Sequence, residues 1–185
     1  MRIPRGAVRI ELPCLVQRED YTCGAAAVLA VSRYFGVGPS SELLVVRHMG
    51  FGTDGSDPAH LMRALRRYRL RVTERRGMSE SELRAAIDRG QPVIVMLQAW
   101  GRRTRYRGHW RDGHWVVMIG YDARGIYVED PMIDGARGFL SWAALADRWH
   151  DIEGRTRRRT PRYGLIVTGG RVRGAQRVRA AISPG

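Results

Sequence analysis

The fold is decided by residues 17–36, which read Gln-Arg-Glu-Asp-Tyr-Thr-Cys-Gly-Ala-Ala-Ala-Val-Leu-Ala-Val-Ser-Arg-Tyr-Phe-Gly. From Cys23 onward the residues are small or apolar, and the apolar ones recur at helical spacing. Asp20 and Thr22 are residue types that cap helix N-termini, and Gly36 is a typical helix stop. The stretch therefore predicts a buried helix with Cys23 in its first turn.

A cysteine in the first turn of a helix is a candidate nucleophile. The unpaired N–H groups and the positive end of the helix dipole both favour the thiolate, which is the reactive form. Gly24 and the alanines that follow leave the thiol of Cys23 uncrowded. The alternative is that Cys23 is a small buried apolar residue, as free cysteines usually are. A partner base elsewhere in the chain has to decide between the two.

The length of 185 residues predicts a single domain over 1–168. The Arg/Gly/Ala-rich residues 169–185 then form a C-terminal tail, which we expect to be poorly ordered. No apolar run is long enough to span a bilayer, and the N-terminus lacks the apolar segment of a signal peptide. We therefore expect a cytoplasmic protein without a membrane span.

Two cysteines, Cys14 and Cys23, are the whole cysteine content of the chain. In a reducing compartment we expect both to be free thiols, because a bridge would consume the proposed nucleophile. No Cys/His cluster has the spacing of zinc ligands. We therefore expect no metal and no cofactor.

The chain has no lysine, so all 32 of its basic residues are arginine, and the net charge is +14. Such a balance allows an acidic partner: nucleic acid, an anionic membrane surface or an acidic peptide. We favour a solvated basic surface for most of these arginines, and nucleic acid as a partner is not expected. One dense group in the loop 101–113 has two interpretations, a solvated loop or a site that holds an acidic peptide at the rim of the cleft: Arg102, Arg103, Arg105, Arg107 and Arg111.

The remaining elements are expected as helices first and a mostly antiparallel sheet afterwards. We therefore predict an α+β fold with an N-terminal helical lobe, a C-terminal β-sheet lobe and a cleft between them. The expected elements are an edge strand over 7–16, helices over 23–36, 41–48, 58–68 and 79–88, strands over 70–74, 92–100, 114–121 and 126–130, a helix from Ser141, a polar loop over 154–162 and a strand over 163–168.

His114 is the candidate base. It begins an apolar strand directly after a loop, and Asp130 ends the next strand. In a hairpin closed near 122–125 the two residues lie close together at the open end, where a carboxylate would fix the imidazole tautomer. Gln17, six residues before Cys23, has an amide that could donate to an oxyanion beside the Cys23 N–H.

Each of these residues also has an ordinary structural interpretation. His114 could be a strand-end histidine, Asp130 part of a turn before Pro131, and Gln17 an exposed polar side chain. His109, in the loop just before, is the one rival for the role of base, while His48 and His60 are expected to be surface or packing residues. The combination of a cysteine, a histidine and an aspartate at these three positions is far more specific than any one of them.

The pattern Gln17-x₅-Cys23-Gly-Ala-Ala-Ala, His114-Trp-Val-Val-Met-Ile-Gly-Tyr and Asp130-Pro131 resembles the C39 peptidases, a papain-like family. The resemblance covers residues 10–168, including the segment from Gly52 that follows the nucleophile helix. Well-known members are bacterial domains of ABC exporters that cut bacteriocin leader peptides after a double glycine.

The resemblance implies a papain-like cysteine peptidase fold. The chain departs from the exporter domains in one respect, since no transmembrane or ATPase region follows, so we expect a free-standing domain. It implies that Cys23 is the nucleophile, His114 the general base, Asp130 the residue that orients it, and Gln17 the oxyanion donor. It further implies hydrolysis of a peptide bond through a thioester acyl-enzyme, at a glycine-containing site in a precursor or leader peptide. A separate ABC exporter is the implied partner.

Two other classes of function remain open at this point. The same thioester could be intercepted by an amine, which would make the protein an acyl- or peptidyl-transferase. The protein could also be a non-catalytic module that binds a peptide or nucleic acid, although the complete set of four residues argues against this.

Overall fold

The structure is a computed structural model that describes residues 3–4, 6–100, 105–154 and 157–170. Residues 101–104 of the arginine-rich loop therefore lie outside the described residues. So does the predicted tail, except for Gly169 and Gly170. No helix in the described ranges is long and apolar enough to span a membrane.

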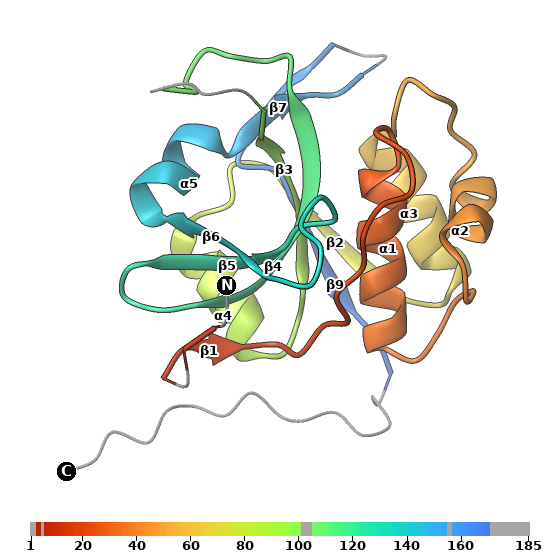
Figure 1. Ribbon diagram of the computed structural model, residues 1–185, viewed down its shortest axis with the longest axis horizontal. Coiled ribbons are helices and arrows are strands. Elements are labelled where there is room, and N and C mark those ends of the chain that lie inside the picture. Colours follow the sequence, from red (N-terminus) through yellow and green to blue (C-terminus); the bar gives the residue numbers. More distant parts are fainter. Residues whose placement is uncertain (1–2, 5, 101–104, 155–156, 171–185) are drawn as a thin grey trace.

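Three helices form a layer on one side of the sheet: α1 (Cys23–Tyr34), α2 (Glu42–Met49) and α3 (Pro58–Arg67) (Figure 1). The first ten residues of α1 are buried, as expected from its small and apolar composition. Ser41 caps α2 by accepting the Leu44 N–H, and Pro58 occupies the first turn of α3. This layer is the predicted helical lobe.

The second lobe is built on an antiparallel sheet with the strand order β2-β9-β3-β4-β5-β6, in which β1 also pairs with β4. Helix α4 (Glu80–Asp88) opens with the predicted capping box of Ser79 and Glu82, and α5 (Trp142–Arg148) is capped by Ser141. The strands of the sheet are β1 (Val8–Arg9), β2 (Arg71–Arg75), β3 (Val93–Gln98), β4 (Gly113–Tyr121), β5 (Gly125–Glu129), β6 (Gly138–Ser141) and β9 (Gly164–Thr168). The α+β architecture with two lobes is confirmed.

Three details differ from the expectations. Only Val8–Arg9 of the predicted strand 7–16 pairs with the sheet, because the chain then leaves the sheet edge. It runs between the sheet and α1 to reach Cys23 (Figure 1). The polar segment 154–162 is not all loop, since β8 (Arg159–Pro161) pairs with β7 (His150–Ile152). Strand β6 was not expected, because its short sequence lies in a glycine-rich region.

The pairing of β4 with β5 contains an irregularity that matters for the site. Val117 lies opposite Glu129, whereas Gly120 lies opposite Tyr127, so β4 holds one extra residue between Met118 and Gly120. Because paired residues share a face of the sheet, such a bulge changes which residues of β5 lie on the same face as the residues at the start of β4.

Gly120 also allows β1 to approach β4. A Cβ at this position would lie 2.6 Å from the carbonyl oxygen of Val8, a distance at which the backbone of β1 has to move. We predict that Gly120→Ala displaces β1 and lowers the free energy of unfolding by about 1–3 kcal/mol. Gly6→Ala, where the added Cβ meets nothing within 4 Å, is the matched control. Chemical denaturation of both variants checks this, and equal stabilities would contradict it.

Candidate active site

Cys23 is the first residue of α1 and is 9% exposed. Thr22 is the N-cap residue, but its hydroxyl does not cap the helix as predicted, because it bonds the backbone of Glu19 instead. The backbone bonds of the helix start with the N–H groups of Ala25 and Ala26, which donate to Thr22 O. The Cys23 N–H lies ahead of them, in the turn whose N–H groups have no intrahelical acceptor.

Gly24 leaves room for the loop that faces the cysteine. A Cβ there would lie 2.2 Å from Ser56 Oγ, 3.1 Å from the Trp115 ring and 3.2 Å from Leu61. The glycine therefore permits the loop 50–57 and strand β4 to pack directly against the first turn of α1. This close approach explains the Cys-Gly pair, which the sequence analysis read only as an absence of crowding.

His114 and Asp130 are brought together as the sequence predicted. His114 Nε2 lies 2.7 Å from Asp130 Oδ1, and that oxygen also accepts the Met132 N–H at 2.9 Å. The histidine is only 2% exposed, on a strand paired with β3 through Leu97. Because Nε2 is taken by the carboxylate, Nδ1 is the ring nitrogen that remains for the interaction with Cys23, which helps to raise the pKa of His114.

The surroundings of His114 favour its protonated form. Burial alone would lower its pKa, but the hydrogen bonds and charges of Asp130 and Cys23 outweigh burial and raise the pKa from 6.5 to about 9. In turn, burial would raise the pKa of Asp130, and the bond from His114 lowers it below its ordinary value. At neutral pH the imidazole is therefore held as a cation beside the thiol.

Two tryptophans near the site were not singled out from the sequence: Trp100 lies beside His114, and Trp115 lies beside Gly24 at the start of α1. The Trp100 ring lies 4.8 Å from the His114 ring between centroids, with 40% of Trp100 exposed. The Trp115 indole N–H donates to Ser56 O at 2.9 Å, which ties strand β4 to the loop 50–57. The sequence did contain a signal for Trp115. It directly follows His114 in the strand, so its side chain is expected on the face of the sheet opposite to that of His114.

Gln17 is buried rather than exposed, at 8%. Its backbone N–H donates to Pro131 O at 2.9 Å, which places it beside Asp130, and its amide Nε2 donates to Glu19 O at 2.8 Å. That bond uses one of the two N–H groups of the amide. Among the described groups, Oε1 of Gln17 has no hydrogen-bond partner.

Three of the other histidines, those considered from the sequence, have partners of their own. His109 Nε2 lies 2.7 Å from Asp112 Oδ2, which makes a separate pair before β4. His48 Nδ1 lies 2.9 Å from the Tyr68 hydroxyl, and His60 Nδ1 accepts the Asp57 N–H at 3.0 Å in the first turn of α3. The structure thus brings His114, and none of these three, against Cys23 and Asp130.

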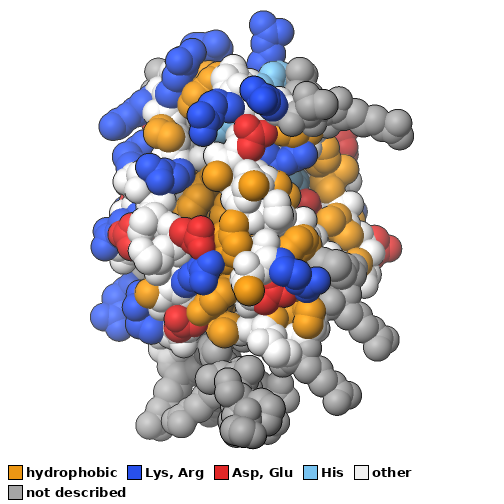
Figure 2. Space-filling view, turned by 90° about the vertical axis from the view of Figure 1, so that its left-hand side faces the viewer, with side chains coloured by type: hydrophobic (Ala, Val, Ile, Leu, Met, Phe, Trp, Pro, Cys, Tyr) orange, Lys and Arg blue, Asp and Glu red, His pale blue; other side chains and the backbone are white. Residues whose placement is uncertain are grey.

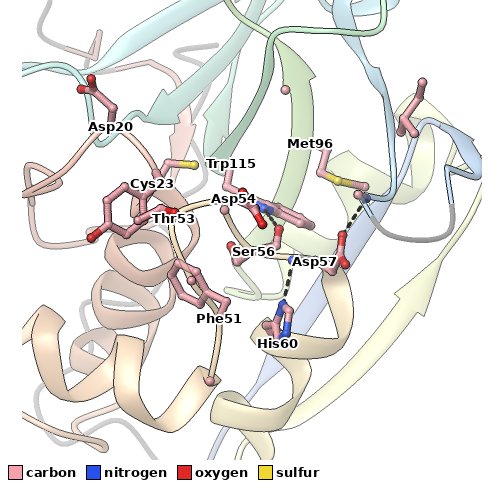
Figure 3. Close-up of a pocket in the computed structure, with 17 residues that line it drawn as sticks. Asp20, Cys23, Phe51, Thr53, Asp54, Ser56, Asp57, His60, Met96 and Trp115 are labelled. Carbon is pink, nitrogen blue, oxygen red and sulfur yellow. Dashed lines mark hydrogen bonds between the residues drawn. The ribbon is translucent and has the colours of Figure 1, made fainter.

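A hollow of about 760 Å³ opens beside Cys23 (Figure 3). In Figure 3 the cysteine comes from the helical lobe, with its sulfur directed toward the side that carries Trp115 and Met96. None of the described residues that line the hollow is arginine, although the chain as a whole is strongly basic. The lining residues are 20–21, Cys23, 50–57, His60, Met96, Gly113, Trp115, Ile152 and Gly154.

A second hollow of about 630 Å³ lies between the described part of the arginine-rich loop and α5, lined by Arg105, Arg107 and Arg148 among others. Asp147 accepts the backbone N–H groups of Tyr106 and Arg107 and so fixes the loop on the helix. Figure 2 shows the side of the molecule that carries α5, where arginines gather toward the upper end.

Both cysteines are free thiols, as expected. Cys14 is exposed, and its Sγ lies 3.7 Å from Ala136 O. Within the described residues, no group of three or more His, Cys, Asp or Glu side chains is arranged to hold a metal ion.

The sequence of residues 9–156 matches the model of a protein family described as the Peptidase_C39 like family. The chain belongs to this family. No curated protein matches the sequence closely enough to be compared. Membership of the family confirms the resemblance that the residues around Cys23, His114 and Asp130 suggested.

Solved structures show the same fold at low sequence identity. A protein from Bacillus anthracis named as a C39-like peptidase superposes with a TM-score of 0.68 and 16% identity, covering 89% of this chain and 99% of that one. The peptidase domain of Streptococcus ComA, a bifunctional ABC transporter of a quorum-sensing pathway, has a TM-score of 0.62, 15% identity and coverage of 87% and 99%. A double glycine motif protease of an AMS/PCAT transporter, solved with its leader peptide, has a TM-score of 0.59, 22% identity and coverage of 89% and 95%.

The raised pKa of His114 leads to a prediction about Cys23. We predict that His114→Ala slows alkylation of Cys23 by iodoacetamide at pH 7 by at least tenfold, because the thiolate loses its cationic partner. Mass spectrometry of the modified peptide, with Cys14→Ala in the background, measures the rate. His109→Ala is the control and should leave the rate unchanged. If the two variants exchanged their effects, His109 would be the partner of the thiol.

Proposed function

We propose that the protein is a cysteine peptidase that uses Cys23 as nucleophile, His114 as general acid and base, and Asp130 to orient His114. The observation that supports this most is the 2.7 Å bond between His114 and Asp130, beside an open hollow that Cys23 lines, with Cys23 contributing to the raised pKa of His114. A nucleophile, a base in contact with it and a third group that orients the base are the parts that covalent catalysis of acyl transfer needs.

The reaction proceeds through a thioester. The Cys23 thiolate attacks the scissile carbonyl carbon, and the proton of the His114 imidazolium passes to the leaving amine as the C–N bond breaks. The neutral imidazole then takes a proton from water, whose oxygen attacks the thioester carbon. The sulfur leaves as thiolate, and the imidazolium of His114 is restored beside it.

The oxyanion of each tetrahedral intermediate is assigned to two donors, the Cys23 N–H and the amide of Gln17. The Cys23 N–H belongs to the helix turn without intrahelical acceptors. Gln17 has a second amide N–H besides the one that donates to Glu19 O. Removal of one such donor typically costs about 10²–10³-fold in kcat.

The substrate is proposed to be an extended peptide with glycine at the cleavage site, such as a precursor or leader peptide. Glycines at 50, 52 and 55 make one wall of the hollow, and a similar structure, the AMS/PCAT protease, was solved with a leader peptide bound. An acidic stretch of such a peptide would fit the arginine-lined hollow on α5 better than the aspartate-lined hollow at Cys23. A cytoplasmic location and a separate ABC exporter as partner belong to this proposal.

The first test replaces the nucleophile. We predict that Cys23→Ala abolishes hydrolysis of a synthetic peptide with a Gly-Gly site and keeps the fold, since the change deletes one sulfur from an alanine-rich helix start. Cys14→Ala is the matched control and should remain active. Mass spectrometry of the products, with and without added hydroxylamine, also separates hydrolysis from transfer to an amine. A folded Cys23→Ala protein with full activity would refute the proposal.

The second test uses pH. Because the imidazolium has to donate a proton, kcat/KM should fall as the pH rises through about 9, the pKa of His114. Asp130→Asn removes the carboxylate that holds this pKa up, so the alkaline limb should move to lower pH by about one unit. Wild-type and variant profiles between pH 6 and 10 check this. An alkaline limb at the same pH in both would exclude Asp130 as the partner that matters.

A further inference from the structure

The segment 15–18, here called the strap, carries Gln17 and passes between the two lobes on its way to Cys23 (Figure 1). Three of its backbone N–H groups donate to acceptors outside the strap. These donors are Leu15, Gln17 and Arg18. Their acceptors come from both lobes, so the strap is fastened from two sides.

On the sheet side the acceptor is Glu129, the last residue of β5 and the neighbour of Asp130. Its Oε1 accepts the Leu15 N–H at 2.7 Å, and its carboxylate is 2% exposed. Arg137 is ion-paired with the other oxygen and also donates to Leu12 O, just before the strap. Pro131 O, two residues beyond Glu129, accepts the Gln17 N–H at 2.9 Å.

On the helical side the acceptor is Glu42, the first residue of α2. It is 6% exposed, and its Oε1 accepts the Arg18 N–H at 3.2 Å. A carboxylate is costly to bury, and a backbone N–H is one of the groups that can offset that cost by a charge-assisted bond. Glu42 therefore connects α2 to the strap.

We propose that Glu42 and Glu129 are positioning residues that hold Gln17 in place for the oxyanion, one from each lobe. The inference rests on the proposed function, in which Gln17 donates to that oxyanion. An oxyanion donor works only when it is held in place before the reaction, and displacements of about 1 Å cost large factors in rate. The backbone of Gln17 is held by Pro131 O, and Gln17 lies between two further fastened residues, Leu15 and Arg18. Release of either neighbour leaves the Gln17 amide less firmly positioned.

This role separates two reactions of the same cysteine. Peptide hydrolysis passes through an oxyanion, whereas alkylation of the Cys23 thiolate by iodoacetamide does not. Loosening the strap should therefore lower kcat for hydrolysis and leave KM and the alkylation rate unchanged. A glutamate that only stabilised the fold would affect both reactions together.

The decisive variants are at position 42. We expect Glu42→Ala to lower kcat at least tenfold, with KM within about twofold and the alkylation profile against pH unchanged. Glu42→Gln should restore kcat to within a few-fold, because its amide oxygen can still accept the Arg18 N–H. Glu80→Ala is the matched control: Glu80 is likewise the first residue of a helix, α4, and pairs with Arg84 rather than with the strap. It should leave kcat unchanged.

A double-mutant cycle with Gln17→Ala completes the test. If Glu42 acts through Gln17, then Glu42→Ala should cause no further loss of kcat once Gln17 is alanine. Any of three results would overturn the inference. The losses of kcat in Glu42→Ala and Gln17→Ala could multiply in the double variant, kcat could be unchanged in Glu42→Ala, or Glu42→Ala could lower kcat and the alkylation rate together. If Gln17→Ala itself kept full kcat, the oxyanion role in the proposed function would fail, and this inference with it. If Gln17→Ala lowered kcat and Glu42→Ala did not, only the inference would fail.

The sheet side is tested without leaving a buried charge unpaired. The double variant Glu129→Met/Arg137→Met replaces both members of the ion pair by apolar side chains. It should lower kcat at least tenfold, spare alkylation and add nothing in the Gln17→Ala background. Thermal unfolding confirms that each variant is folded, so an unfolded variant on one side leaves the other side to decide the inference.

Discussion

Asp130 lies on the same face as His114 because β4 holds one extra residue between Met118 and Gly120. If the pairing at the hairpin end, where Gly120 lies opposite Tyr127, continued without a bulge, Asp130 would lie opposite Val117. Val117 is three residues from His114 in β4, so its side chain is on the other face of the sheet. The bulge shifts the register so that Val117 faces Glu129, and Asp130 reaches the position of Val116, two residues from His114. The 2.7 Å bond between His114 and Asp130 depends on that single insertion.

The raised pKa of His114 is not what the net charge of the chain alone would produce. A protein with a net charge of +14 would by itself disfavour another cation, yet the pKa of His114 is raised to about 9. Asp130 and Cys23 achieve this at short range, where pairwise interactions are strong and little screened. The described residues around the neighbouring hollow add aspartates and no arginine, so the basic side chains do not line the space beside Cys23.

Much of the site was predictable because it depends on local signals. The alanine-rich start of α1 places Cys23, and the capping residues before α2, α3 and α4 mark their starts. The closeness of His114 and Asp130 was inferred from a hairpin closed near 122–125, which gives the right strands but not the bulge. No residue type marks the extra residue at Ile119, since it depends on how β1 and β5 both meet β4. Gln17 was placed by its spacing from Cys23, while the buried carboxylates of Glu42 and Glu129 that fasten its backbone come from segments distant in sequence.

The two halves of the site differ in how they are attached to the molecule. His114 belongs to a strand that pairs on one side with β3 and on the other with β5, in the middle of the sheet. His114 itself pairs with Leu97 of β3 near the start of β4, and the pairing with β5 begins only at Val117. Its amide exchanges with solvent deuterium when the pairing of β3 with β4 opens. The strap around Gln17 is held by side-chain carboxylates and one carbonyl, so a local opening exposes its amides to exchange. Exchange at His114 thus reports the opening of paired strands, whereas exchange in the strap reports a segment that can open on its own.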